Sequence, residues 1–231
     1  MKTDTANQKT GYVFCGGSIS EKLADCLPGL GPGERAAGAA YIVAADRGLV
    51  FLEKHGIVPD LIVGDFDSSP EGFIDEYRSR HPDVMIRTFD PEKDYTDSEI
   101  GVRAAVEQGC GHIVMIGATG TRLDHVLGNI QVLAWLLSKA VSGEMIDPYN
   151  RITIHDRPFS VRKDSQWGKY VSFFAYGGDV TGLTLSGFHY TVKDFTLTSV
   201  GSRAVSNEID LEEGTVSFSG GKLLMIESRD G

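Results

Sequence analysis

The sequence predicts an α/β protein, with an N-terminal Rossmann-like parallel sheet and flanking helices followed by a C-terminal all-β sandwich. From residue 11 to about residue 156, short apolar runs alternate with helical patterns, as in a parallel sheet that helices cover on both faces. After residue 157 only short strands separated by Gly and Asp follow. With 231 residues, the chain is long enough for two small domains. We therefore expect an α/β domain over residues 1–156 and a β-sandwich domain over residues 157–231.

Five buried strands are expected in the first domain, because each is a nearly continuous apolar run. They are residues 12–14, 41–45, 61–63, 84–88 and 112–117, with 151–155 as a candidate sixth strand. Four segments between these strands carry apolar residues at helical spacing. They are residues 47–55, 70–80, 97–108 and 123–139. Thr96 followed by Glu99 has the pattern of a capping box, so a helix is expected to begin beside Asp97.

The second domain is expected to contain short antiparallel strands only, since no amphipathic run of helix length remains after residue 157. The expected strands are residues 170–176, 180–185, 189–192, 215–219 and 222–228. A small β-sandwich or barrel is the natural architecture for such a segment.

The composition excludes several classes of partner. The chain has 22 basic and 32 acidic residues, a formal charge of −10, and no Lys/Arg cluster, so a nucleic-acid backbone would be repelled. No stretch of about 18 apolar residues predicts a membrane span, and residues 1–10 contain no apolar targeting segment. Cys15, Cys26 and Cys110 are odd in number and lack C-x-x-C spacing, which favours reduced thiols in the cytoplasm.

Acidic residues follow two of the predicted strands. Asp65 and Asp67 come directly after the strand over residues 61–63, and residues 92–97 follow the next strand along the chain. Open α/β sheets bind ligands at the carboxyl ends of their strands, and carboxylate oxygens suit Mg²⁺. Helix capping explains Asp97 equally well, and Lys93 is either a phosphate contact or a solvated charge. We expect a site for a magnesium-bound polyphosphate at this edge.

Loops after the other strands extend the same edge. After the strand over residues 112–117, Gly117 and Gly120 would let the backbone approach a ligand, and Arg122 offers a planar fork for phosphate. Asp124 and His125 stand at the start of the next helix, where capping also explains Asp124. Three further candidates are Gly16 and Gly17, for phosphate, and Asp46, for a ribose or base. No P-loop and no G-x-S-x-G motif occurs.

Several motifs, taken in chain order, resemble the thiamine pyrophosphokinase family. They are ADRG (45–48), PDLIVGDFDS (59–68), EKDYTD (92–97), GATGTRLDHVLGN (117–129), SFFAYGGDVTGLTLSGFHY (172–190) and VSNE (205–208). The resemblance implies an N-terminal α/β domain and a C-terminal β-sandwich in a homodimer. It also implies that the enzyme transfers the pyrophosphoryl group of ATP to the hydroxyl of thiamine and leaves AMP.

The resemblance also assigns residues to roles. It implies that the magnesium ligands are Asp65, Asp67 and Asp97, and that the residues beside the transferred phosphates are Asp94 and Lys93. It implies that Arg122 and Asp124 contact nucleotide phosphate and the reacting end of thiamine. We assign the remaining ATP contacts to Gly16, Gly17, Asp46 and His125. Ser206 and Asn207 are implied to bind the thiamine pyrimidine near the subunit interface.

Two alternatives stay open at this point. An acid-rich sheet edge would equally serve a related magnesium-dependent pyrophosphokinase that acts on a pterin alcohol. The chain could also be a non-catalytic nucleotide sensor whose β domain recognises a partner. The full set of acidic and basic groups argues against a simple sensor, and formation of AMP from MgATP and either alcohol would separate the three cases.

Overall fold

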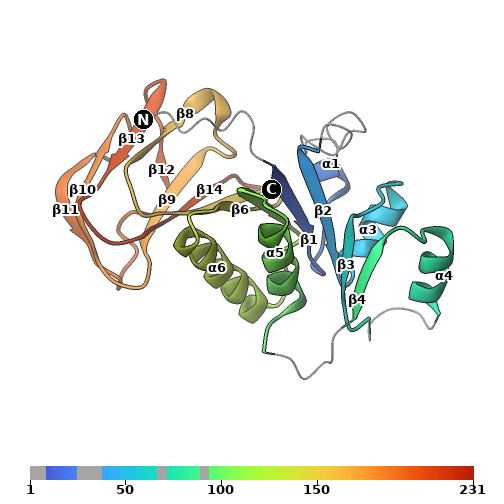
Figure 1. Cartoon of the computed structure of the whole chain (residues 1–231). Helices are drawn as coiled ribbons and strands as arrows, with labels where there is room; N and C mark the ends of the chain where they lie inside the picture. The colour runs from blue at the N-terminus through green and yellow to red at the C-terminus, as the bar shows by residue number, and fades with distance from the viewer. Residues whose placement is uncertain (1–8, 25–37, 67–71, 89–93) are drawn as a thin grey trace. The chain divides into compact units, whose positions relative to one another are not determined.

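The computed structural model describes residues 9–24, 38–66, 72–88 and 94–231, and the chain divides into two compact units (Figure 1). The first unit is Met1–Pro148 and the second is Tyr149–Gly231. Among the described residues, no helix combines the length and the hydrophobicity needed to cross a bilayer.

The first unit contains a parallel sheet in the order β6-β5-β1-β2-β3-β4. The strands are β1 (Thr10–Phe14), β2 (Ala40–Ala45), β3 (Leu61–Gly64), β4 (Met85–Thr88), β5 (His112–Ile116) and β6 (Ser142–Ile146). Val, Ile, Leu and Ala fill the central strands because both of their faces are covered; β3, for example, is buried along its whole length.

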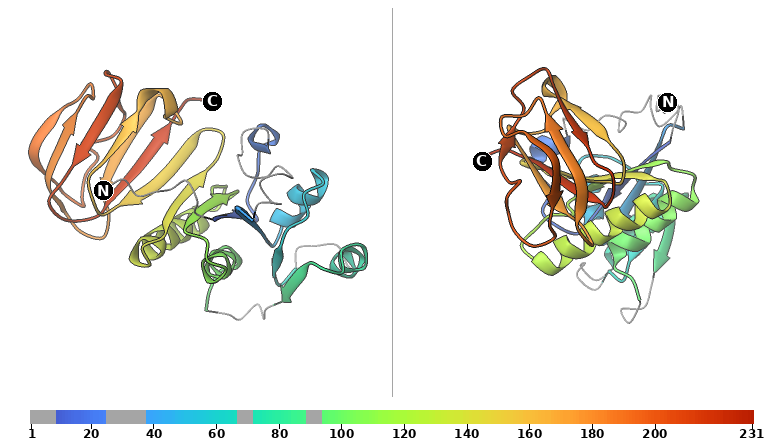
Figure 2. Two further views of the ribbon diagram at one scale, coloured as in Figure 1. Left: turned by 45° about the horizontal axis from the view of Figure 1, so that its top comes forward. Right: turned by 90° about the vertical axis from the view of Figure 1, so that its left-hand side faces the viewer.

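Helices connect these strands. They are α1 (Glu21–Ala24), α3 (Gly48–Lys54), α4 (Phe73–Arg80), α5 (Asp97–Glu107) and α6 (Leu123–Ser138). Helices α5 and α6 lie side by side on one face of the sheet, and α3 lies on the other (Figures 1 and 2). The chain runs outward from β1 to β4 and then returns to β5 on the far side of β1. The carboxyl ends of β1 and β5 therefore form the topological switch point, where open α/β sheets bind ligands.

The second unit is an antiparallel sandwich with strand orders β12-β9-β14-β7 and β11-β10-β13-β8 (Figure 2). The strands are β7 (Asn150–His155), β8 (Phe159–Arg162), β9 (Tyr170–Ala175), β10 (Val180–Ser186), β11 (Val192–Leu197), β12 (Asn207–Glu208), β13 (Glu213–Ser217) and β14 (Leu223–Ser228), with a short 3-10 helix, η2 (Lys163–Ser165). Its core is apolar, and the rings of Phe173 and Phe188 meet edge to face at 5.6 Å.

The predicted fold class is confirmed, with local corrections. All five expected parallel strands form, and the candidate sixth strand over residues 151–155 forms as β7, but β7 belongs to the second unit and pairs antiparallel with β14. The sixth parallel strand is β6, whose first three residues are Ser, Gly and Glu and therefore present no apolar run. Residues 189–191 lie outside any strand, and β11 begins only at Val192.

The expected helix starts and ends agree closely with the structure. The helices predicted over residues 47–55, 97–108 and 123–139 form as α3, α5 and α6. Of the predicted segment 70–80, residues 70 and 71 lie outside the described part, and α4 covers the rest from Phe73. Five further elements of the described residues carried no clear sequence signal, and they are α1, β6, β8, η2 and β12.

Candidate functional site

The loops after β1 and β5 touch at the switch point. The Gly17 amide donates to the Gly117 carbonyl at 3.1 Å. A Cβ at position 17 would lie 2.3 Å from that carbonyl oxygen, and Gly117 has a φ of +70°. Only glycine fits this approach, so the packing of the two loops explains Gly17 without any ligand. Its amide is already committed, which makes Gly16 the better of the two predicted phosphate contacts.

The cysteine at the end of β1 is not a nucleophile. Cys15 is buried, and burial raises the pKa of its thiol to about 12. Cys110 is also buried and free, with its pKa raised by burial to about 11. Because a thiolate is the reactive form, both groups are inert at neutral pH. Cys26 lies outside the described residues.

Two side chains fix the loop that follows β5. The buried Asn129 of α6 donates from Nδ2 to the Ala118 carbonyl at 2.8 Å. The Thr119 hydroxyl donates to Asp147 Oδ2 at 2.7 Å. The loop therefore has its shape before any ligand arrives. Sequence reasoning missed Thr119 and Asp147; Asp147 directly follows β6, and its place at the sheet edge would have been visible had that strand been predicted.

The loop ends at a close ion pair. Arg122, the N-cap residue of α6, donates from Nη2 to Asp124 Oδ2 at 2.5 Å and from Nε to Oδ1 at 3.2 Å. Chiefly because of this hydrogen bonding, the pKa of Asp124 falls to about 2 and that of Arg122 rises above its usual value. Both side chains are more than half exposed, and His125 beside them is exposed too. The pair is open to solvent and accessible to an anionic ligand.

Asp46 and Asp65 lie at neighbouring strand ends. The Asp46 amide donates to the Val63 carbonyl at 2.8 Å, which continues the pairing of β2 with β3 one step beyond β2. A Cβ at Gly64 would lie 3.3 Å from the Asp46 Cα, and one at Gly16 would lie 3.2 Å from Asp46 Oδ2. The structure therefore brings Gly16 next to Asp46 at the carboxyl edge of the sheet, and Gly64, the residue before Asp65, also lies next to Asp46.

The second acidic segment leads into α5. The Thr96 hydroxyl accepts a hydrogen bond from the Glu99 amide at 3.2 Å, so Thr96 caps the helix as predicted. The Glu99 carboxylate pairs with Arg103 at 2.8 Å, so the reciprocal half of the capping box is replaced by an ion pair. Asp97 is the first residue of α5 and is partly buried, whereas Asp94 is exposed. The helix start explains Asp97 without a metal.

The predicted magnesium ligands stay a prediction as a set. Asp67 and Lys93 lie outside the described residues. Within the described parts of the chain, no three His, Cys, Asp or Glu side chains gather in a way that would hold a metal ion. The donor chemistry nevertheless fits a hard cation, since Asp65 follows β3 directly and a carboxylate at position 67 would be two residues away.

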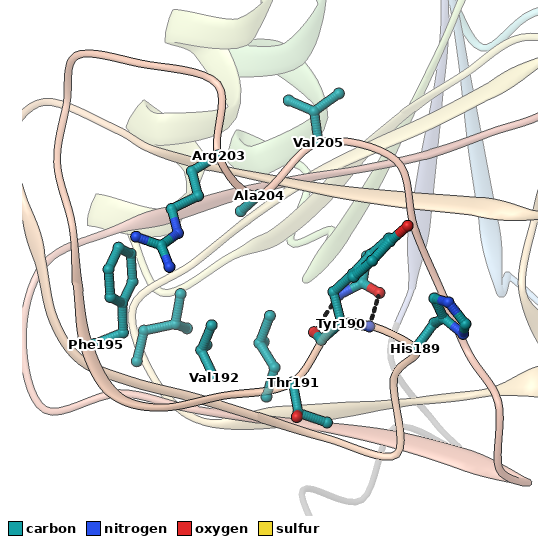
Figure 3. A pocket seen from close by; sticks show the side chains of 11 residues that line it. His189, Tyr190, Thr191, Val192, Phe195, Arg203, Ala204 and Val205 are labelled. Atoms are coloured by element: carbon teal, nitrogen blue, oxygen red, sulfur yellow. Dashed lines mark hydrogen bonds between the residues drawn. The ribbon is translucent and has the colours of Figure 1, made fainter.

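A second candidate site lies in the sandwich. A cavity of about 350 Å³ opens between apolar side chains, with Arg203 and Phe195 at one end and His189 and Tyr190 at the other (Figure 3). The guanidinium of Arg203 lies 4.7 Å from the centre of the Phe195 ring. The full lining is Leu183, Leu185, His189, Tyr190, Thr191, Val192, Phe195, Arg203, Ala204, Val205 and Asn207.

Asn207 clamps Tyr190 at the edge of this cavity. Its Oδ1 accepts from the Tyr190 amide at 2.9 Å, and its Nδ2 donates to the Tyr190 carbonyl at 2.8 Å. Oδ1 also accepts from the Glu208 amide, so the buried Asn207 has one remaining N–H for a ligand. The Tyr190 ring is left 64% exposed. Tyr190 was missed as a site residue, because only this distant contact singles it out.

Ser206 adjoins the clamp. It is exposed, has a φ of +58°, and donates from its backbone amide to Ser172 Oγ at 3.0 Å. A positive φ at a residue other than glycine costs about 1 kcal/mol or more and persists only where the surroundings enforce it. Ser206 is therefore held at a strained turn directly before Asn207, and of the two predicted residues Asn207 lines the cavity.

Comparisons with known proteins agree in both units. A family model described as "Thiamin pyrophosphokinase, catalytic domain" matches residues 34–143. A second, "Thiamin pyrophosphokinase, vitamin B1 binding domain", matches residues 158–223. The thiamine pyrophosphokinase of Bacillus subtilis (strain 168) is 34% identical over 189 residues, which cover 81% of this chain and 87% of that protein.

Solved structures give the same result. The crystal structure of the Bacillus subtilis thiamine pyrophosphokinase has a TM-score of 0.85 and 30% identity, and covers 96% of this chain and 100% of its own. The thiamin pyrophosphokinase of Geobacillus thermodenitrificans has a TM-score of 0.81 and 32% identity, with 96% and 98% covered. On these matches, the chain belongs to the thiamin pyrophosphokinase family.

Proposed function

We propose that this chain transfers the pyrophosphoryl group of ATP to the hydroxyl of thiamine, giving thiamine diphosphate and AMP. The observation that carries the proposal is the match of one chain to both the catalytic and the vitamin B1 binding models, in that order. The Bacillus and Geobacillus relatives both carry the name of this activity. We assign nucleotide and metal binding to the first domain, and thiamine binding and dimerisation to the second.

ATP is assigned to the carboxyl edge of the parallel sheet. The proposed contacts are Gly16, Asp46, Arg122 and His125, and the predicted contact Gly17 is kept as the residue that shapes the loop through its hydrogen bond to Gly117. The fixed loop after β5 supports this assignment, because a preformed loop spends no binding energy on its own ordering. The exposed guanidinium of Arg122 can meet two phosphate oxygens with the fork that now meets Asp124.

Asp65, Asp67 and Asp97 are the residues that would hold Mg²⁺, with Asp94 and Lys93 beside the transferred phosphates. The ion would supply positive charge that offsets the charge of the polyphosphate and helps to orient it. The chain's own contribution is positional. Asp65 extends from the end of a rigid buried strand, and Asp97 opens a capped helix, so neither depends on a flexible backbone.

Asp124 is assigned to the thiamine hydroxyl. A carboxylate whose pKa is about 2 accepts a hydrogen bond well but removes a proton poorly at neutral pH. Its role is therefore to orient the alcohol oxygen toward the β-phosphorus. If phosphate draws Arg122 away, the pKa of Asp124 rises toward its ordinary value, which makes the carboxylate a better proton acceptor as the substrates assemble.

Thiamine is assigned to the region of Tyr190, Ser206 and Asn207. The exposed Tyr190 ring offers a flat surface for an aromatic, cationic ligand, and the Ser206 hydroxyl and the remaining Asn207 N–H offer polar contacts. We propose a homodimer with this region near the subunit interface; exposed apolar surface there, such as that of Val205 at the cavity, supports it. We also propose a cytoplasmic location, in keeping with buried, free cysteines.

A substrate screen tests the proposed function. Purified protein is incubated with MgATP and either thiamine, a pterin alcohol or no acceptor, and AMP is measured. AMP that depends on thiamine supports the proposal. AMP that depends only on the pterin would replace it with the related pyrophosphokinase. Nucleotide binding without AMP from either alcohol would identify a sensor. Light scattering at several concentrations tests the homodimer separately.

A further inference from the structure

Arg103 bridges two aromatic rings that come from different segments of the first unit. Its guanidinium carbon lies 4.3 Å from the ring centre of Tyr95, in the segment before α5, and 4.3 Å from the ring centre of Trp135 in α6. Glu99 Oε1 accepts from Arg103 Nε at 3.0 Å and from Nη2 at 2.8 Å. The side chains of Arg103 and Glu99 are 30% and 22% exposed, so the ion pair is shielded from most of the solvent.

Tyr95 is placed where its anchoring affects the chemistry. It stands between Asp94 and Asp97 in the sequence, and both acids belong to the proposed phosphate site. Tyr95 is 46% exposed, and its ring packs against the guanidinium of Arg103. Thr96 is held by the Glu99 amide, so α5 secures this short segment at two successive residues, 95 and 96.

The other ring ties the segment to α6. Trp135 belongs to the helix whose first turn carries Asp124 and whose N-cap is Arg122. Through Arg103, the segment with Asp94 and Asp97 is thus connected to the helix that presents the alcohol-orienting carboxylate. In phosphoryl transfer the protein contributes mainly the alignment of the reacting groups rather than covalent chemistry. A connection between the two segments that carry these groups therefore affects that alignment.

We propose that Arg103 is a positioning residue for pyrophosphoryl transfer, which it serves by packing its guanidinium on both the Tyr95 ring and the Trp135 ring. Without the Arg103 side chain, Asp94 and Asp97 are still present, but the backbone segment between them loses its anchor. The inference rests on the proposed function, since the effect of Arg103 on alignment is measured through the rate of that reaction.

Four variants test the proposal: Tyr95→Leu, Tyr95→Phe, Arg103→Met and the double variant Tyr95→Leu/Arg103→Met. Loss of the ring or of the guanidinium should lower kcat at least ~10-fold while KM for thiamine stays within about twofold. Tyr95→Phe keeps a ring and should restore kcat to within about twofold of the wild type. The double variant should be no slower than the slower single variant, because both changes remove the same contact.

A matched control is available on α4. Arg80 also lies over a tyrosine ring, that of Tyr77 at 5.6 Å, and pairs with Glu53 and Glu76. It is the last residue of α4, which leads to the amino end of β4, whereas the proposed site lies at the carboxyl ends of the strands. Arg80→Met should leave kcat unchanged. If Arg103→Met does not fold, Tyr95→Leu alone carries the test, since Tyr95 is half-exposed and its loss leaves no core cavity.

Fluorescence gives a readout that does not require turnover. The chain has two tryptophans, so a Trp167→Phe background makes Trp135 the single reporter. Acrylamide quenching of Trp135 should increase in Arg103→Met and Tyr95→Leu but not in Arg80→Met. Wild-type kcat in both single variants, or kcat losses that multiply in the double variant, would overturn the proposal. A wild-type protein that makes no AMP would instead contradict the proposed function, even with the quenching result intact.

Discussion

Arg122 and Asp124 form a two-point hydrogen-bonded ion pair at the start of α6, although their side chains are 67% and 61% exposed. Exposed pairs of this kind contribute little to stability, because water and salt screen them. Their geometry matters for a different reason. The pair keeps a carboxylate ionised and a guanidinium oriented at the edge of a fixed loop, ready to exchange partners when an anionic substrate arrives.

The pH dependence of turnover should reflect this pair. Because Arg122 holds the pKa of Asp124 at about 2, the carboxylate is ionised at every pH above about 4 and should produce no titration step in kcat/KM. Asp124→Asn should lower kcat by a similar factor, on the order of 10²-fold, across the accessible pH range. A pH profile from about pH 5 to pH 9 checks this. An acid limb with a pKa above about 5 that disappears in Asp124→Asn would contradict it.

The acids assigned to the metal should be essential for turnover and dispensable for folding. Asp65→Asn and Asp67→Asn should each abolish AMP formation, because a neutral amide is a poor ligand for a hard cation. Circular dichroism and thermal melts should match the wild type. Asp75→Asn is the control, since Asp75 is 83% exposed on α4 and pairs with its neighbour Arg78. Near-normal activity in both site variants would remove the metal assignment.

Gly17→Ala should weaken nucleotide binding through the backbone. The new Cβ would lie 2.3 Å from the Gly117 oxygen, so the two loops must separate. We expect KM for ATP to rise at least ~10-fold and stability to fall by about 1–3 kcal/mol. Gly128→Ala in α6 is the comparison: a Cβ there meets nothing within 4 Å, and the helix should gain up to about 1 kcal/mol. Equal KM for ATP in Gly17→Ala and the wild type would show that the loop contact does not shape the nucleotide site.

The thiamine side should respond to Tyr190 and Asn207 together. Asn207→Ala leaves the amide and carbonyl of Tyr190 without their partner and should cost about 1–3 kcal/mol of stability. It should raise KM for thiamine strongly and leave KM for ATP within about twofold. Tyr190→Phe should keep affinity for thiamine, whereas Tyr190→Ala should lose it. Isothermal titration with thiamine separates these effects, and unchanged affinity in Tyr190→Ala would move the thiamine site elsewhere.

The sandwich should lose stability in mild acid because of His155. Its imidazole packs on the Phe159 ring at 3.8 Å and lies 2.9 Å from the Thr153 hydroxyl, and burial lowers its pKa to about 4. The folded state therefore disfavours the charged form, and stability is full above about pH 6.5 and declines as the pH falls toward 4. The loss is at most about 3 kcal/mol. The Tm of the wild type and the Tm of His155→Gln, each measured as a function of pH, should converge at low pH. If the two plots of Tm against pH are parallel, His155 does not cause the acid destabilisation.

The local pattern was enough to predict most of the fold. Central strands such as β3 are covered on both faces and must be apolar throughout, so their sequences identify them. The local sequence pattern gave wrong or missing predictions where long-range contacts determine the structure. Residues 189–191 alternate like a strand, yet Asn207 holds Tyr190 in a loop from 17 positions away. Thr119 and Asp147 are 28 positions apart, and their hydrogen bond cannot be predicted from the local sequence around either residue.

The same limit applies to the site. The topology of a parallel sheet predicts that the loops with Gly16, Asp46 and Asp65 share one edge, and the structure places Gly16 and Gly64, the residue before Asp65, next to Asp46. Spacing alone could not foresee that Asp124 would be held by Arg122, nor that the Gly17 amide would be committed to Gly117. Such details depend on side-chain and backbone geometry after folding.

The products of a single reaction test the central claim most directly. The protein is incubated with thiamine and MgATP labelled at the β-phosphate, and the nucleotide and thiamine products are separated and counted. Pyrophosphoryl transfer predicts equal amounts of AMP and thiamine diphosphate, with all of the label in the thiamine product. Label retained in ADP together with thiamine monophosphate, or no labelled thiamine product at all, would contradict the account.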